Sequence, residues 1–100
     1  MEIFKFGGAS VKDAAGVKNV LEVLKTVGHE NVLLVISAMG KTTNALEIVI
    51  KNYFDKSNEL YASLQDIRKY HNQILLDLFE DEEHEVFFFF FFLFDDFEYF

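Results

Sequence analysis

Two short glycine-bearing loops constrain this chain more than any other feature of its sequence. The first, Lys5 to Val11, follows an apolar N-terminal segment, and the second, Ser37 to Asn44, follows the apolar run Val32 to Ile36. A helical pattern begins after each loop. The repeated order of strand, loop and helix is typical of a doubly wound α/β fold, in which parallel strands carry their loops at one edge of the sheet.

The spacing of apolar residues predicts two strands and a connecting helix in the first third of the chain. Ile3 to Phe6 is β-prone, and Val32 to Ile36 predicts a strand buried on both faces because its apolar residues do not alternate with polar ones. Between them, either Ser10 or Asp13 could cap a helix that Gly28 ends. The apolar face of this helix consists of Val17, Val20, Leu21, Leu24 and Val27.

Two further helices are predicted after the second loop. Thr43, or Thr42 before it, could cap the first of them. Its expected apolar face is Leu46, Val49, Ile50, Tyr53 and Phe54. The polar stretch of residues 55–58 then breaks the pattern. The last helix presents Leu60, Leu64, Ile67, His71, Ile74, Leu75 and Leu78 on one face.

Length and composition bound the function. The 100 residues allow at most one domain, which is small for an enzyme that holds a nucleotide and a second substrate, so we expect a part of a larger protein. There is no cysteine, and the N-terminus lacks the layout of a signal peptide, which together predict a cytoplasmic location. Residues 1–70 carry nine basic and eight acidic residues without a basic stripe, so nucleic-acid binding is not expected.

Residues 81–100 form an acidic and phenylalanine-rich tail that differs in kind from residues 1–80. The uninterrupted run Phe87 to Phe92 has no binary pattern, so it does not define an inward face. The apolar stretch Val86 to Phe94 has nine residues, whereas a helix needs about 20 to cross a bilayer, so no membrane partner is expected. A docking or membrane-surface segment is one interpretation, and a corrupted, mistranslated or poorly determined stretch that replaces an ordinary amphipathic helix is the favoured one.

The residue types in the two loops are those of a phosphate-binding site. Gly7 and Gly8 allow backbone amides to approach an anion closely, and Lys5 supplies a positive charge at the end of a strand. Each residue also has an ordinary structural explanation, as a solvent-exposed lysine or a turn glycine. Two such loops at corresponding places favour the phosphate site and a nucleotide-dependent kinase.

Other chemistries fit the sequence less well. Gly40-Lys41-Thr42 imitates the end of a Walker A loop, but Val35 stands where that loop needs its first glycine, and no G-x-G-x-x-G is present. The three histidines, His29, His71 and His84, are widely spaced, so we interpret them as surface or core residues and predict no metal site.

The two loops together resemble the N-terminal part of the aspartate kinases, in the amino-acid kinase superfamily. The first loop matches that family's opening signature, with Ala9 where threonine or serine is usual, and Val35 to Asn44 matches its second loop. The resemblance runs from residue 2 to about residue 80. It implies a three-layer αβα fold of the carbamate-kinase type, incomplete at its C-terminal end, with residues 1–80 as the N-terminal part of the catalytic domain.

The resemblance also implies a reaction and residue roles. The family transfers a phosphoryl group from ATP, with Mg²⁺, to the side-chain carboxylate of L-aspartate. By position, Lys5 would balance charge on the transferred group. The residues expected to bind ATP are Lys5, Phe6, Gly7, Gly8 and Ser37, and those expected to bind the substrate are Ser10 and Thr43. A homo-oligomer is expected for the full-length protein.

Two alternatives remain open. Another member of the superfamily, a glutamate, acetylglutamate or uridylate kinase, would keep the fold and change the acceptor. A non-catalytic interaction module would instead use the last helix and the aromatic tail as its binding surface. In the family, the aspartate-binding loop, the adenine pocket and the regulatory domains lie beyond residue 100, so we expect this polypeptide alone to lack kinase activity.

Overall fold

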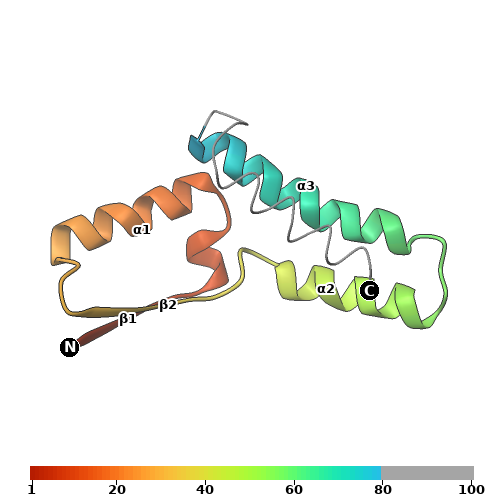
Figure 1. The fold of residues 1–100 in the computed structure, drawn as a ribbon, viewed down its shortest axis with the longest axis horizontal. Helices are drawn as coiled ribbons and strands as arrows, with labels where there is room; N and C mark the ends of the chain where they lie inside the picture. The colour runs from red at the N-terminus through yellow and green to blue at the C-terminus, as the bar shows by residue number, and fades with distance from the viewer. Residues whose placement is uncertain (80–100) are drawn as a thin grey trace.

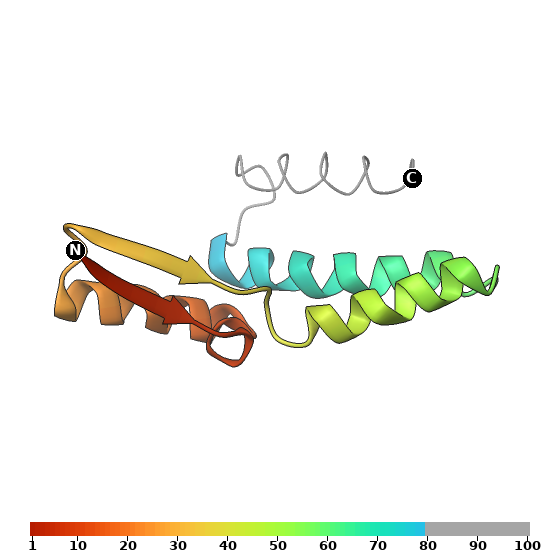
Figure 2. The same ribbon diagram turned by 90° about the horizontal axis from the view of Figure 1, so that it is seen from below.

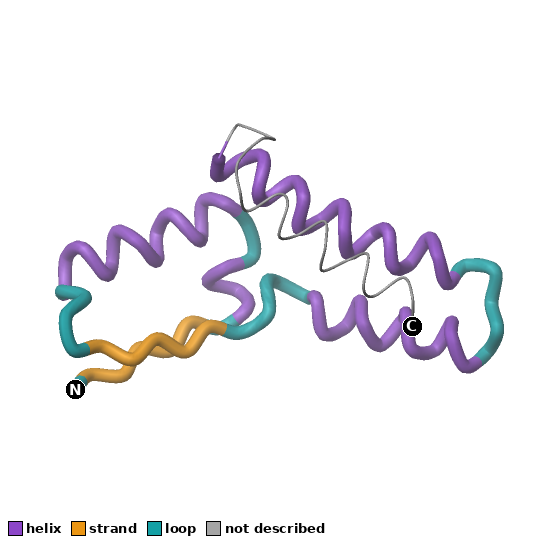
Figure 3. Tube along the Cα trace, in the orientation of Figure 1, coloured by secondary structure: helices purple, strands orange, loops and turns teal. Residues whose placement is uncertain are grey.

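The computed structural model describes residues 1–79, which form two strands, one 3-10 turn and three α-helices (Figure 1). In chain order the elements are β1 (Glu2–Phe6), η1 (Gly8–Val11), α1 (Ala14–Val27), β2 (Val32–Ile36), α2 (Thr42–Phe54) and α3 (Leu60–Phe79). Figure 3 shows how short the loops between them are. The mixed α/β class and the predicted order of elements are confirmed, whereas the predicted tail, residues 81–100, lies outside the described residues.

The two strands form a parallel sheet with an in-step register. Glu2 pairs with Val32 at one end and Phe6 with Ile36 at the other. The crossover helix α1 lies along one side of the strands, and α2 continues away from them beyond their carboxyl ends (Figure 2). The sheet and α1 thus form two layers, one of strands and one of helix. The three-layer αβα fold of the amino-acid kinases stays a prediction.

The prediction that Val32 to Ile36 is buried on both faces is wrong for the described part of the chain. Leu34 is 40% exposed and Ile36 is 54% exposed. On the other face, Leu33 and Val35 are 47% and 42% exposed. The described sheet has two strands, so β2 lies at its edge, and α2 does not fold back over it (Figure 2). β2 therefore has more apolar surface than the other residues of 1–79 bury.

Helix α1 begins and ends at sequence signals. The Asp13 side chain accepts a hydrogen bond from the Gly16 amide at 2.8 Å, so Asp13, and not Ser10, is its N-cap. Gly28 ends the helix with φ at 93°, and its amide donates to the Leu24 carbonyl at 2.9 Å. A positive φ of this kind favours glycine because other residues have a Cβ that clashes there.

Helix α2 begins without the predicted cap. Its N-cap is Lys41, whose side chain makes no capping hydrogen bond. The Thr42 hydroxyl instead donates backward to the Met39 carbonyl at 2.5 Å, and Thr43 lies exposed in the first turn. The prediction of Thr43 or Thr42 as a cap is therefore wrong, because the chain already turns into the helix around Met39 and Gly40.

Helices α2 and α3 form an antiparallel hairpin (Figure 1). The Asn52 amide nitrogen donates to the Ser63 hydroxyl at 3.1 Å, which ties the two helices together near the connecting turn. The predicted inner face of α3 is confirmed, since Ile67 and Ile74 are 6% and 4% exposed. The predicted apolar face of α2 is largely uncovered among the described residues.

The most buried hydrophobic side chains lie on the helices and η1. They are Val11, Ala14, Val20, Ile67 and Ile74, and Thr42 is buried with them. Because α3 packs against both α2 and α1, this core lies where the helices converge near the carboxyl ends of the strands. The same convergence positions the two glycine loops.

Candidate functional site

The two glycine loops meet at one end of the sheet. The Ser37 amide donates to the Phe6 carbonyl at 3.0 Å, and the Gly40 amide donates to the Gly8 carbonyl at 3.0 Å. Both loops leave the strands at the carboxyl ends, where parallel α/β sheets bind their ligands. The structure thus joins the two segments that the sequence singles out.

Gly8 is required by the close approach of the loops. A Cβ there would lie 2.6 Å from the Gly40 carbonyl oxygen and 2.9 Å from that of Ala38. These are backbone atoms, which do not move aside as the end of a side chain does. Gly40 itself has φ at 56°, in the left-handed region.

Gly7 has a different environment. Its φ is −78°, so its backbone conformation does not require glycine, and a Cβ there would have no neighbour within 4 Å. The structural explanation for paired glycines, a positive φ, thus applies to neither Gly7 nor Gly8. The open space beside Gly7 allows a ligand to approach its backbone.

Lys5 and Phe6 end β1 on opposite faces of the sheet. Strand residues alternate in direction, which places Lys5 with Ile3 on one face and Phe6 with Phe4 on the other. Lys5 and Ile3 are exposed, whereas the two phenylalanines are half-buried. Lys5 is therefore accessible to a ligand at the start of the first loop.

The three predicted hydroxyl residues lie around the same end of the sheet but differ in setting. Ser10 belongs to η1, and its amide donates to the Gly7 carbonyl at 3.0 Å. The Ser37 hydroxyl donates to the neighbouring Ala38 carbonyl at 3.3 Å. Thr43 is exposed on the first turn of α2. All three are accessible, and their roles in binding remain predictions.

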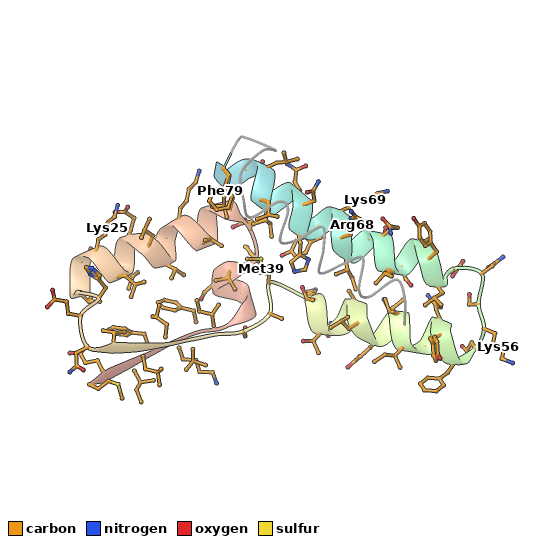
Figure 4. The ribbon with its side chains drawn as sticks, viewed as in Figure 1. Lys25, Met39, Lys56, Arg68, Lys69 and Phe79 are labelled. Atoms are coloured by element: carbon orange, nitrogen blue, oxygen red, sulfur yellow. The ribbon has the colours of Figure 1, made fainter. Side chains whose placement is uncertain are left out.

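A pocket of about 470 Å³ opens beside the loops, between the start of α1, the start of α2 and α3. It is lined by Lys12, Asp13, Gly40, Lys41, Thr42, Ala45, Asp66, Ile67 and Tyr70. The Tyr70 hydroxyl donates a hydrogen bond to the Lys12 carbonyl. Figure 4 shows Met39, half-buried, in the same junction where the second loop passes between η1 and α3.

Sequence reasoning missed Lys12, Lys41 and Tyr70. Lys12 directly follows the first loop and Lys41 lies within the second, so their positions in the sequence could have indicated them. Tyr70 lies 58 residues from Lys12 on a helix whose pattern gives no link to the loops. Only the packing of α3 against α1 brings it there.

Residues 1–79 contain neither a cluster of metal ligands nor a membrane-spanning helix. Within this range no group of three or more His, Cys, Asp or Glu side chains is close enough to hold a metal ion. None of the helices described is long and apolar enough to cross a membrane. The His71 ring nitrogen Nδ1 lies 2.8 Å from the Ile67 carbonyl, one turn earlier on α3, which agrees with a packed histidine.

Comparisons with known proteins point to one class, the aspartokinases. The chain is 48% identical over 44 residues to Aspartokinase 1, chloroplastic, and 46% identical over 44 residues to Aspartokinase 2, chloroplastic, both of Arabidopsis thaliana. It is 28% identical over 78 residues to Bifunctional aspartokinase/homoserine dehydrogenase 2, chloroplastic, of the same plant.

These similarities are partial. They cover 44% of the chain for the two aspartokinases and 78% for the bifunctional protein, but the chain spans only 8% of the length of each relative. No family model matches the chain, and no solved structure matches it. The comparisons establish a partial sequence similarity to aspartokinases.

Proposed function

We propose that the chain forms the phosphate-binding part of an aspartate kinase, which transfers the γ-phosphoryl group of ATP to the side-chain carboxylate of L-aspartate. The observation that carries this proposal is the hydrogen-bonded pair of glycine loops at the carboxyl ends of two parallel strands. The names of the similar proteins favour aspartate over glutamate, acetylglutamate or uridylate as the acceptor.

The loops fit a nucleotide phosphate chain. The open space beside Gly7 leaves its backbone accessible to an anion, and the exposed Lys5 supplies a positive charge two residues earlier. ATP bound at the two glycine loops would supply the γ-phosphoryl group that is transferred. The described residues offer no carboxylate cluster for Mg²⁺, so we assign no ligand of that ion to them.

Each residue has a role in this proposal. Lys5 balances charge on the transferred phosphoryl group, and the amides around Gly7 and Gly8 bind phosphate oxygens. Ser37 lies on the phosphate side, and Thr43 contacts L-aspartate together with Ser10. Such a transfer needs no protein nucleophile, because positioning and electrostatic stabilisation supply most of the rate enhancement.

The compartment remains a prediction. The named relatives are chloroplastic, whereas the sequence predicts the cytoplasm. Homo-oligomerisation of the full-length protein likewise remains a proposal.

Titration of the isotopically labelled chain with MgATP tests the phosphate site. We expect amide chemical shifts of Gly7, Gly8 and Ser37 to move, and Lys5→Ala to weaken binding by about tenfold, because it removes a charged partner. Lys18→Ala, an exposed lysine on α1, is the matched control and should bind as the parent chain does. Shifts confined to other residues, or equal affinities for the two variants, would contradict the proposed site.

A further inference from the structure

Tyr70 on α3 connects the two glycine loops. Its hydroxyl donates to the carbonyl of Lys12, which follows the first loop. The same hydroxyl is the nearest atom to the position that a Cβ on Gly40 would occupy, so it lies directly against the second loop. One side chain, 58 residues from Lys12 in sequence, therefore touches both loop regions.

The environment of Tyr70 favours a fixed position. The side chain is half-buried and lines the pocket with Ile67, which is 6% exposed and lies one turn earlier on α3. Ile74, on the next turn, is 4% exposed. Tyr70 thus projects from the buried face of a helix that packs against both α1 and α2.

We infer that Tyr70 is a positioning residue, which fixes the two glycine loops relative to each other and so orders the backbone amides of the proposed phosphate site. The inference rests on the proposed function for its ligand and on the structure for its geometry. The loops share a direct backbone hydrogen bond, from the Gly40 amide to the Gly8 carbonyl. Without the tyrosine hydroxyl, the Lys12 carbonyl loses its partner and this loop contact should open more often.

Amide hydrogen exchange on the full chain tests the positioning. Tyr70→Phe removes the hydroxyl and keeps the ring. We expect the Gly40 amide to exchange about fivefold faster relative to the Gly28 amide, which reports α1 away from the loops. A general loss of stability would raise both rates and leave their ratio unchanged. Tyr61→Phe, on the exposed side of α3, is the matched control.

Titration of the same variants with MgATP links the position to binding. We expect Tyr70→Phe to weaken MgATP binding severalfold and Tyr61→Phe to leave it unchanged. An unaltered Gly40 to Gly28 ratio in Tyr70→Phe would overturn the inference. An altered ratio with undiminished MgATP affinity would overturn the role in binding. If the parent chain does not bind MgATP, the proposed function fails, and the exchange ratio alone decides whether Tyr70 orders the loops.

Discussion

A methyl group added at Gly8 would meet two backbone carbonyl oxygens within 3 Å, whereas one added at Gly7 would meet nothing within 4 Å. The two neighbouring glycines therefore serve different needs. Gly8 permits the loops to touch, which is a requirement of the fold. Gly7 has no such requirement in residues 1–79, so a need for glycine there would come from a ligand.

Alanine substitutions separate these two needs. We expect Gly8→Ala to lower the free energy of unfolding by about 1–3 kcal/mol, because the added methyl group overlaps backbone atoms of the second loop. Gly7→Ala should leave it within about 1 kcal/mol, since alanine adopts a φ of −78° without strain. Denaturant unfolding of both variants measures the difference. Equal losses would show that the loops do not pack as described.

The role of a single residue could be predicted where it depends on neighbours in the sequence. Gly28 was predicted and Asp13 was one of two predicted N-caps, because a helix cap depends on the few residues beside it. Thr43 was misassigned because the alternative, a hydroxyl bond from Thr42 back to Met39, leaves no distinctive pattern in the sequence. Tyr70 was not anticipated because its partners come from distant parts of the chain.

At the scale of elements, α2 has an apolar stripe that the described residues leave uncovered. Leu46, Ile50 and Tyr53 are 37%, 54% and 56% exposed, and Phe54 is 75% exposed. The half-buried residues Ala45, Val49 and Asn52 lie on an adjacent face of the helix, and Asn52 bonds to α3. Periodicity identified α2 as a helix but did not show which side of its broad apolar surface meets α3.

Two isoleucines test this arrangement. Ile74→Ala is expected to reduce the free energy of unfolding by about 2–4 kcal/mol, because it leaves a cavity in the core. Ile50→Ala should reduce it by less than about 1 kcal/mol, since that side chain is already half exposed. Both values come from denaturant unfolding. Comparable losses would mean that the α2 stripe is covered in solution.

At the scale of the whole molecule, the sequence predicted the joining of the loops but not the full layering. Parallel strands carry their loops at the same edge of the sheet, so the proximity of the two loops followed from the strand pattern, whereas the hydrogen bond from the Gly40 amide to the Gly8 carbonyl was not predicted. Burial of β2 on both faces did not follow, because it depends on a second layer over the sheet. Helix α1 lies beside the strands, whereas α2 and α3 extend past them (Figure 2).

Kinase activity is a property of the whole molecule. We expect none from this chain alone. In the proposed function the phosphate site supplies only part of the active site, and the chain spans 8% of each named relative. We therefore expect no ATP- and aspartate-dependent acyl phosphate, trapped as the hydroxamate, from the 100-residue polypeptide. Hydroxamate formation by the purified chain would contradict this expectation.

A hybrid enzyme tests the proposed function through the activity that it gains. Residues 1–79 replace the matching region of Bifunctional aspartokinase/homoserine dehydrogenase 2, to which the chain is similar over 78 residues, and hydroxamate formation is expected to return. Within the hybrid, Lys5→Ala should lower kcat at least about 100-fold, as loss of a group that stabilises transition-state charge does. Lys18→Ala should keep the hybrid's activity. A folded hybrid without activity, or one indifferent to Lys5→Ala, would separate this chain from aspartate kinase chemistry.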